Sequence, residues 1–276
     1  MKDTKNTAIF FIHIPKTAGT SFTRILEQLY PPEARCNAYY IQELIEVDPK
    51  TLSQLRLFIG HIDYAANELM PKPLNIVTFI RDPVERAISA YNHIKANADH
   101  PQHDLFNAEV SSLYDFANHP EFSRQLRNTQ TGMLGRDNKF KLLYDLAHNK
   151  QIELNEAKYL SNFHRQHEVT KIDLFVAQER LRKMSFFGIM GWFDASISIF
   201  CDMFGVPHPT HPPRDNIAVY RQTSEKPEYD KRDMEAVREL VYIDNQLYNF
   251  SKRLFMSRFG AEFNKFQEKK RNRLAR

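Results

Sequence analysis

Cysteine is scarce in this sequence, which has only Cys36 and Cys201 among its 276 residues. The two lie far apart and without the spacing of metal ligands, so we expect neither a disulfide framework nor a zinc site, and a reducing compartment fits best. No apolar run approaches the roughly 20 residues that a membrane helix needs. The N-terminus lacks the charged segment, the long apolar stretch and the small-residue cleavage site of a signal peptide. If the chain is complete, we therefore expect a cytoplasmic protein with no membrane span.

Internal repeats and low-complexity linkers are also absent, and residues 1–276 are predicted to form a single domain. With 42% hydrophobic and 26% charged residues, the composition is that of a globular protein. The net charge of +4 favours an anionic ligand but is too small to indicate nucleic acid. The end of the chain, residues 265–276, is basic, and we expect it to be a solvated, frayed tail.

Short apolar runs followed by polar turns predict the strands of a parallel sheet. Helical patterns follow the first and third of these runs, so the expected fold class is α/β, with a P-loop-like parallel β-sheet flanked by helices. The predicted strands are Ala8–Ile14, Leu57–Gly60, Asn75–Ile80, Leu174–Ala177 and Phe186–Met190.

The remaining segments are predicted to be mostly helical. Residues 104–167 have helical spacing and form a helical insertion that we expect to line part of a cleft. A helix over Trp192–Phe204 should end at Gly205, residues 207–213 should form a loop, and residues 228–259 should form one long closing helix. The aromatic side chains of that last helix are most simply explained by core packing.

The stretch His13–Ser21 connects a predicted buried strand to a predicted helix. Successive backbone N–H groups and a helix N-terminus there form a ready anion site, and Lys16, Thr17, Thr20 and Ser21 add a cation and hydroxyl groups. The lysine precedes the glycine and the Gly-Lys-Ser/Thr ending of a Walker A loop is missing, so no Mg²⁺ need be assumed.

A second candidate anion site follows the strand that ends at Ile80. Arg81 lies at the carboxyl end of that strand, where open α/β sheets bind ligands, and Ser89 lies two turns into the next helix. Together they could hold a second phosphate. We expect Asp82 to be a neighbour of this site or a helix cap, and Arg86 to form a structural ion pair.

Both stretches resemble motifs of a known family. HIPKTAGTS is similar to the 5′-phosphosulfate loop, and RDPVERAISAY to the 3′-phosphate motif, of sulfotransferases that use 3′-phosphoadenosine 5′-phosphosulfate (PAPS). The likeness is to the carbohydrate branch, which includes heparan sulfate 2-O-sulfotransferase and bacterial relatives. It extends to Gly60-His61, to Asn128–Thr131 and to Asp244–Tyr248. One departure is Gly191, which stands where the family often has an acidic residue.

This resemblance implies a role for each matching residue. Lys16, Thr17, Ala18, Gly19, Thr20 and Ser21 would hold the phosphosulfate, and Arg81 and Ser89 the 3′-phosphate. His61 would take the proton from the acceptor hydroxyl, and Lys16 would stabilise charge on the bridging oxygen, as sulfuryl transfer requires. His13 and Asp63 remain open as alternative bases, although His13 inside a strand is more simply a hydrogen-bonded core residue.

We therefore expect a cytoplasmic, bacterial-type sulfotransferase that uses PAPS as co-substrate, requires no metal and acts on a carbohydrate or other hydroxyl-bearing acceptor. The helical insertion would form part of the acceptor cleft. An atypical P-loop kinase and a non-catalytic protein that binds nucleotides or polyanions remain as alternatives. The sequence predicts neither the acceptor nor the oligomeric state.

Overall fold

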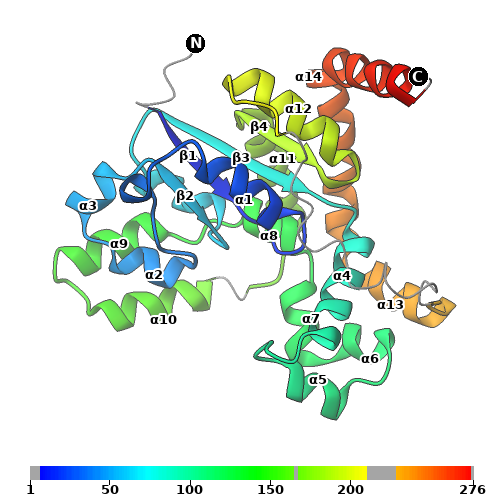
Figure 1. Cartoon of the computed structure of the whole chain (residues 1–276). Helices are drawn as coiled ribbons and strands as arrows, with labels where there is room; N and C mark the ends of the chain where they lie inside the picture. Colours follow the sequence, from blue (N-terminus) through cyan, green and yellow to red (C-terminus); the bar gives the residue numbers. More distant parts are fainter. Residues whose placement is uncertain (1–6, 165–166, 210–227, 275–276) are drawn as a thin grey trace.

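The centre of the fold is a parallel sheet of four strands in the order β2-β1-β3-β4. The structure is a computed structural model that describes residues 7–164, 167–209 and 228–274 (Figure 1). The strands are β1 (Ala8–Ile12), β2 (Leu57–Gly60), β3 (Leu74–Ile80) and β4 (Phe186–Ile189). The expected α/β class with a parallel sheet is confirmed, as are four of the five predicted strands.

The strand register brings four carboxyl ends to one edge of the sheet. Ile12 pairs with Gly60 of β2 and with Thr78 of β3, and Ile80 pairs with Ile189 of β4. All five residues of β1 are buried, as the continuous apolar run predicts for a strand covered on both faces. The residues that follow the strands, among them His13, His61 and Arg81, therefore come together at this edge.

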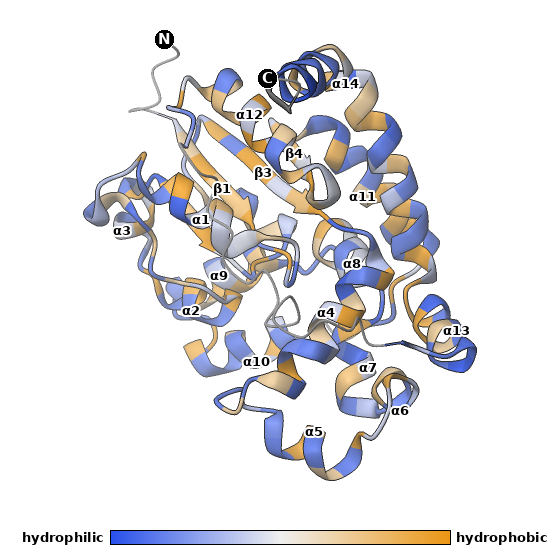
Figure 2. Ribbon diagram, turned by 45° about the vertical axis from the view of Figure 1, so that its right-hand side comes forward, coloured by the Kyte–Doolittle hydropathy of each residue, from blue (hydrophilic) through white to orange (hydrophobic). Residues whose placement is uncertain are grey.

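Aromatic side chains attach the surrounding helices to the sheet. α1 (Gly19–Glu27) and α12 (Phe193–Phe204) meet through Phe22 and Phe200, whose ring centroids lie 4.8 Å apart. α14 (Tyr242–Leu274) packs Phe255 6.0 Å from Phe187 of β4. Figure 2 shows the strands coloured as hydrophobic, with hydrophilic residues along the outer helices. The predicted core packing of the last helix is confirmed for Phe255 and Phe259, which are buried.

A helical insertion separates β3 from β4, as predicted. After α4 (Pro83–Ala96), it comprises α5 (His103–Glu109), α6 (Leu113–Asn118), α7 (Pro120–Leu126), α8 (Thr129–Gly135), α9 (Phe140–His148) and α10 (Leu154–His164). Helices α5–α7 build a second hydrophobic core with α4 and α13 (Lys231–Leu240), below the sheet in Figure 1. α10 packs instead on α9 and on α2 (Ile41–Glu46). The single-domain assignment stays a prediction.

Short helices complete the described chain. They are the α-helix α3 (Pro49–Gln54) and the 3₁₀ helices Pro32–Ala34, Tyr64–Leu69 and Met190–Trp192. The predicted helix ending at Gly205 is confirmed as α12. Residues 210–213 of the predicted loop at 207–213 lie outside the described residues.

The predicted strand Leu174–Ala177 is wrong, because this segment belongs to α11 (Lys171–Lys183). Thr170 and Asp173 form a capping box that starts the helix, with each side chain bonded to the other residue's backbone N–H. Leu174, Ala177 and Leu181 are buried at helical spacing. A run of four apolar residues fits a strand or a buried helix equally well, and here the cap decides for the helix.

The predicted single closing helix is also wrong, since α13 ends at Leu240 and α14 begins at Tyr242. The break lets α13 pack on the second core, while the Asn128 side chain accepts bonds from the backbone N–H groups of Ile243 (2.9 Å) and Asp244 (3.1 Å) at the start of α14. The expected frayed tail differs from the structure as far as Leu274, because α14 continues helical to that residue. Within the described ranges, no helix has the length and apolar character needed to cross a membrane.

Candidate active site

The loop between β1 and α1 is shaped by two residues with left-handed backbone conformations, Lys16 (φ 67°) and Ala18 (φ 71°). The Thr17 hydroxyl donates to the carbonyl oxygen of Ile14 at 2.8 Å and is fully buried, so it closes the loop from inside. The His13 ring lies against Gly19, where an added Cβ would come within 1.8 Å of His13 Nε2. Only glycine permits this close approach.

A cavity of about 940 Å³ opens at the carboxyl edge of the sheet, next to this loop. Of the residues predicted to bind the phosphosulfate and the 3′-phosphate, all but Thr17 line it. Those lining residues are Lys16, Ala18, Gly19, Thr20, Ser21, Arg81 and Ser89, and His61 and His13 line the same cavity. With its hydroxyl turned inward, Thr17 could serve the predicted role only through its backbone amide.

Other residues of the cavity wall were not predicted from the sequence. They include Tyr39, His93, His100, Trp192, Phe266 and Lys270. Lys270 and Phe266 belong to the last turns of α14, which lie beside α12 in Figure 1. The basic end of the chain therefore forms part of the site.

Two cations lie side by side in the cavity wall. Arg81 donates from Nη1 to the carbonyl oxygen of Lys16 at 3.1 Å, so its guanidinium also holds the loop. Burial, and then the charge of Arg81, lower the pKa of Lys16 to about 8. Burial also lowers the pKa of Arg81, partly offset by Glu85, which lies 3.6 Å away. A bound anion would counteract both effects, and these residues therefore suit an anionic ligand such as a phosphate.

Arg81 is held in place by a buried polar network from the helical insertion. The Gln130 side chain accepts from Arg81 N (3.0 Å) and donates to Arg81 O (2.9 Å). Asp244 of α14 in turn accepts from the backbone N–H groups of Gln130 (3.1 Å) and Thr131 (2.7 Å). The two segments Asn128–Thr131 and Asp244–Tyr248 thus support the site structurally, and none of their residues lines the cavity beside the loop.

The predictions for the neighbours of Arg81 hold in part. Asp82 caps α4, because its carboxylate accepts from Val84 N and Glu85 N at 3.0 Å. Arg86 is 1% exposed and donates to the carbonyl oxygen of Leu126 at 2.8 Å. Burial lowers the pKa of Arg86, while the charge of Asp244 raises it. Arg86 is therefore a buried structural cation with Asp244 as its electrostatic partner.

Two histidines and a tyrosine form a cluster beside the loop. His61 Nδ1 is hydrogen-bonded to the carbonyl oxygen of His13. The Tyr39 hydroxyl lies 2.9 Å from His13 Nδ1 and 3.3 Å from His61 Nε2. Burial, and then the charges of His61 and Lys16, lower the pKa of His13 to about 3, so this ring is neutral at physiological pH. His13 is thus a hydrogen-bonded, largely buried residue, as expected, although it also lines the cavity.

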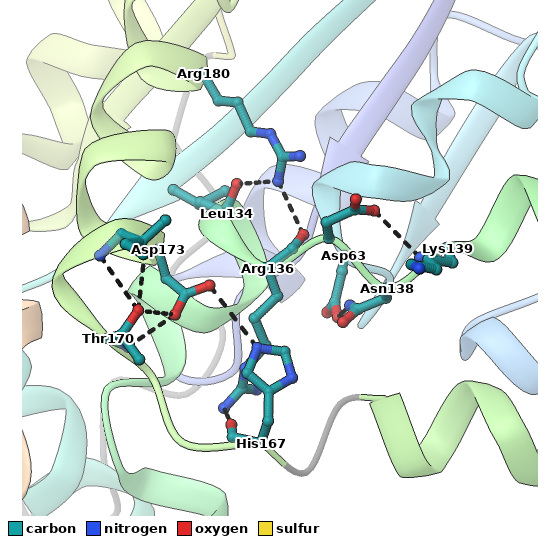
Figure 3. Close-up of polar contacts among 11 residues, drawn as sticks. Asp63, Leu134, Arg136, Asn138, Lys139, His167, Thr170, Asp173 and Arg180 are labelled. Atoms are coloured by element: carbon teal, nitrogen blue, oxygen red, sulfur yellow. Dashed lines mark hydrogen bonds and ion pairs between the residues drawn. The ribbon is translucent and has the colours of Figure 1, made fainter.

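Asp63, the third candidate base, lies elsewhere. Its side chain is 1% exposed and accepts a hydrogen bond from Asn138, and it lines neither of the two cavities described here. Figure 3 shows it beside Asn138, while Arg180 in the same view donates to the carbonyl oxygens of Leu134 (2.8 Å) and Arg136 (3.0 Å). This position supports a structural role for Asp63 and favours a histidine as the base.

A second cavity of about 500 Å³ adjoins the first. Lys16, His61, His93 and His100 line both of them and therefore stand at their junction. The far wall comes from the helical insertion and carries Arg124, Arg127 and Arg136. Within the described ranges, no group of three or more His, Cys, Asp or Glu side chains is placed to hold a metal ion, and a reaction without metal stays a prediction.

The site thus combines a phosphate-type loop at the carboxyl edge of a parallel sheet with two cations and histidines in one cavity. This arrangement is typical of α/β proteins that bind anionic ligands. The chain matches the family described as "Sulfotransferase family" over residues 1–251 and belongs to it. The expected recognition is confirmed at this level, and the match leaves the kinase alternative without support.

The relatives include sulfotransferases of the carbohydrate branch and one that is named for tyrosine. Heparan-sulfate 6-O-sulfotransferase 2 from Gallus gallus is 23% identical over 285 residues, which cover 91% of this chain and 67% of the relative. The Homo sapiens protein of the same name is 23% identical, with 91% of this chain and 45% of the relative covered. A protein-tyrosine sulfotransferase from Arabidopsis thaliana is 31% identical over 85 residues, 30% of this chain and 16% of the relative. The chain thus spans from 16% to 67% of the length of these relatives.

Proposed function

We propose that the protein transfers a sulfuryl group from PAPS to a hydroxyl of a carbohydrate acceptor, with His61 as the general base. The observation that carries this proposal is that Lys16, Arg81 and His61 line a single cavity. Their separate sequence segments are joined by two contacts, from Arg81 to the backbone of Lys16 and from His61 to the backbone of His13.

In this proposal, the donor supplies an activated sulfuryl group, and the protein's own residues bind and orient it. The loop amides from Lys16 to Ser21 surround the 5′-phosphosulfate, while Arg81 and Ser89 take the 3′-phosphate. Lys16 stabilises the negative charge that develops on the bridging oxygen when the bond to sulfur breaks. Because Lys16 is largely buried and lies beside Arg81, an anion at this point interacts strongly with its charged form.

His61 takes the proton of the attacking hydroxyl. Its Nδ1 faces a carbonyl oxygen, which can only accept, so Nδ1 carries the hydrogen and Nε2 has the lone pair. The acceptor would reach this atom through the second cavity, since His61 lines both cavities. A carbohydrate acceptor is favoured by the heparan-sulfate 6-O-sulfotransferases that match 91% of the chain, compared with 30% for the tyrosine sulfotransferase.

The test is a transfer assay with PAPS labelled at sulfur over a panel of glycans, tyrosine peptides, lipids and small alcohols. We expect label in at least one glycan and none when Lys16→Ala replaces the wild type. Label only in tyrosine peptides would support sulfotransferase activity but reject a carbohydrate as the acceptor. A chain that binds the nucleotide but labels no acceptor would support the non-catalytic alternative.

A further inference from the structure

Tyr39 occupies a position that neither the phosphate loop nor the proposed base explains. Its backbone carbonyl accepts from His61 N at 2.7 Å, and its backbone N–H donates to Glu43 at 2.6 Å. At Gly60, an added Cβ would lie 2.3 Å from Tyr39 O, so only glycine lets the end of β2 come this close. The main chain of Tyr39 is therefore fixed directly against the His61 backbone.

The side chain of Tyr39 places one hydroxyl between two histidines. Oη is 2.9 Å from His13 Nδ1 and 3.3 Å from His61 Nε2. The shorter contact is a good hydrogen bond, whereas the longer one is outside the usual range for an N–H and an oxygen. We assign the phenol hydrogen to the shorter contact, so that Tyr39 donates to His13 Nδ1 and an oxygen lone pair is left on the side of His61 Nε2.

The protonation states support this arrangement. Burial, and then the charge of Tyr40, raise the pKa of Tyr39 to about 12, so the phenol keeps its hydrogen. The pKa of His13 at about 3 leaves that ring neutral and able to accept at Nδ1. With His61 Nδ1 donating to the His13 carbonyl, a neutral His61 has no hydrogen for Tyr39, but a protonated His61 has one on Nε2.

We propose that Tyr39 is a positioning residue for His61, which fixes the ring orientation and accepts a hydrogen bond from Nε2 once that atom has taken the acceptor proton. This inference rests on the proposed function. As the acceptor oxygen bonds to sulfur and the bond between sulfur and the bridging oxygen breaks, the hydroxyl proton passes to Nε2. The new N–H, formed along the line to the acceptor oxygen, is shared between that oxygen and Tyr39 Oη, whose own hydrogen stays on oxygen and donates to His13. All protons are accounted for within these three side chains and the acceptor.

The first test is Tyr39→Phe, which keeps the ring and removes only the oxygen. We expect kcat to fall about ten- to a hundredfold, the range for losing a hydrogen bond to a charged group, with the acceptor KM and the nucleotide Kd changed less than about twofold. The matched control is Tyr144→Phe, because the Tyr144 hydroxyl is bonded to Val47 O at 2.6 Å and Tyr144 lines neither cavity. The control should keep the wild-type kcat.

The second test needs no turnover, and its first part uses only the wild-type protein. In nitrogen-15 spectra of histidine-labelled wild type, with the His61 signals assigned by loss in His61→Asn, neutral His61 should carry its hydrogen on Nδ1. In Tyr39→Phe, we expect the protonation of Nε2 to move to lower pH, because the imidazolium loses an acceptor. A wild-type kcat in Tyr39→Phe, or hydrogen on Nε2 in the neutral wild type, would overturn the inference.

The two kinds of failure can be told apart. If the wild type labels no acceptor, the proposed function fails, and the nitrogen-15 spectra still decide whether Tyr39 and the His13 carbonyl orient His61. If the wild type is active and both readouts are unchanged in Tyr39→Phe, only the role of Tyr39 is wrong.

Discussion

The lowered pKa of Lys16 makes the affinity for a phosphate ligand depend on pH in a window where few other groups titrate. Burial and Arg81 place this pKa at about 8, and a bound phosphate should raise it by stabilising the charged form. Below about pH 8 the lysine is charged and attracts the ligand. As the pH rises through 8 that charge is lost, so binding must weaken.

The magnitude follows from linkage. Between the pKa of Lys16 in the free protein and its higher pKa in the complex, binding takes up one proton. Each pH unit in this range therefore weakens binding by about 1.4 kcal/mol, which is a tenfold increase in Kd. At pH 8, about half a proton should be taken up on binding. Titration calorimetry with adenosine 3′,5′-bisphosphate, the desulfated product of PAPS, at pH 7 to 9.5 in buffers of different ionisation enthalpy measures both quantities.

Lys16→Arg is the matched control, since an arginine stays charged across this range. Its profile should be flat between pH 8 and 9.5, whatever its affinity at pH 7. A wild-type Kd that does not change over this range, with no proton uptake, would refute the inference that Lys16 contacts the phosphates.

Three further outcomes are expected. Adenosine 3′,5′-bisphosphate should raise the melting temperature more than AMP does, because Arg81 and Ser89 offer a second anion site, and equal shifts would remove the case for that site. Arg81→Ala should weaken binding of the bisphosphate by about 1.5 to 3 kcal/mol while the fold persists, and an unchanged Kd in calorimetry would show that the guanidinium serves only the loop. Gln130→Leu should lower the free energy of unfolding by about 1 to 3 kcal/mol, because it leaves the Arg81 backbone N–H and C=O unpaired. Denaturant titration checks this, with the exposed Gln151→Leu as control, and equal stabilities of the two variants would contradict it.

The sheet and its loops could be predicted because their signals are local. Continuous apolar runs ending in polar turns gave β1, β2 and β3 within two residues, and the loop at Lys16 follows directly from the strand before it. The wrong strand at Leu174–Ala177 also came from a local signal. The prediction followed the short apolar run and not the capping box that Thr170 and Asp173 form just before it.

The support of the site could not be predicted in the same way. Gln130 and Asp244 meet across 114 positions of sequence, and Tyr39 reaches His13 from 26 positions away within an irregular segment. The contact between Gln130 and Asp244 arises only when the helical insertion and α14 pack together, and that of Tyr39 only when its segment packs against the end of β2. The resemblance pointed to the segments at 128–131 and 244–248, but their structural role became visible only in the folded chain.

The most direct test of the account compares His61→Ala with His13→Ala in the transfer assay, together with nucleotide binding for each folded variant. We predict that His61→Ala lowers turnover by about two to four orders of magnitude and leaves nucleotide affinity nearly intact, because a general base acts on the acceptor and not on the donor. Loss of turnover in His13→Ala with nucleotide binding intact, while His61→Ala remains active, would contradict the assignment of His61 as the base.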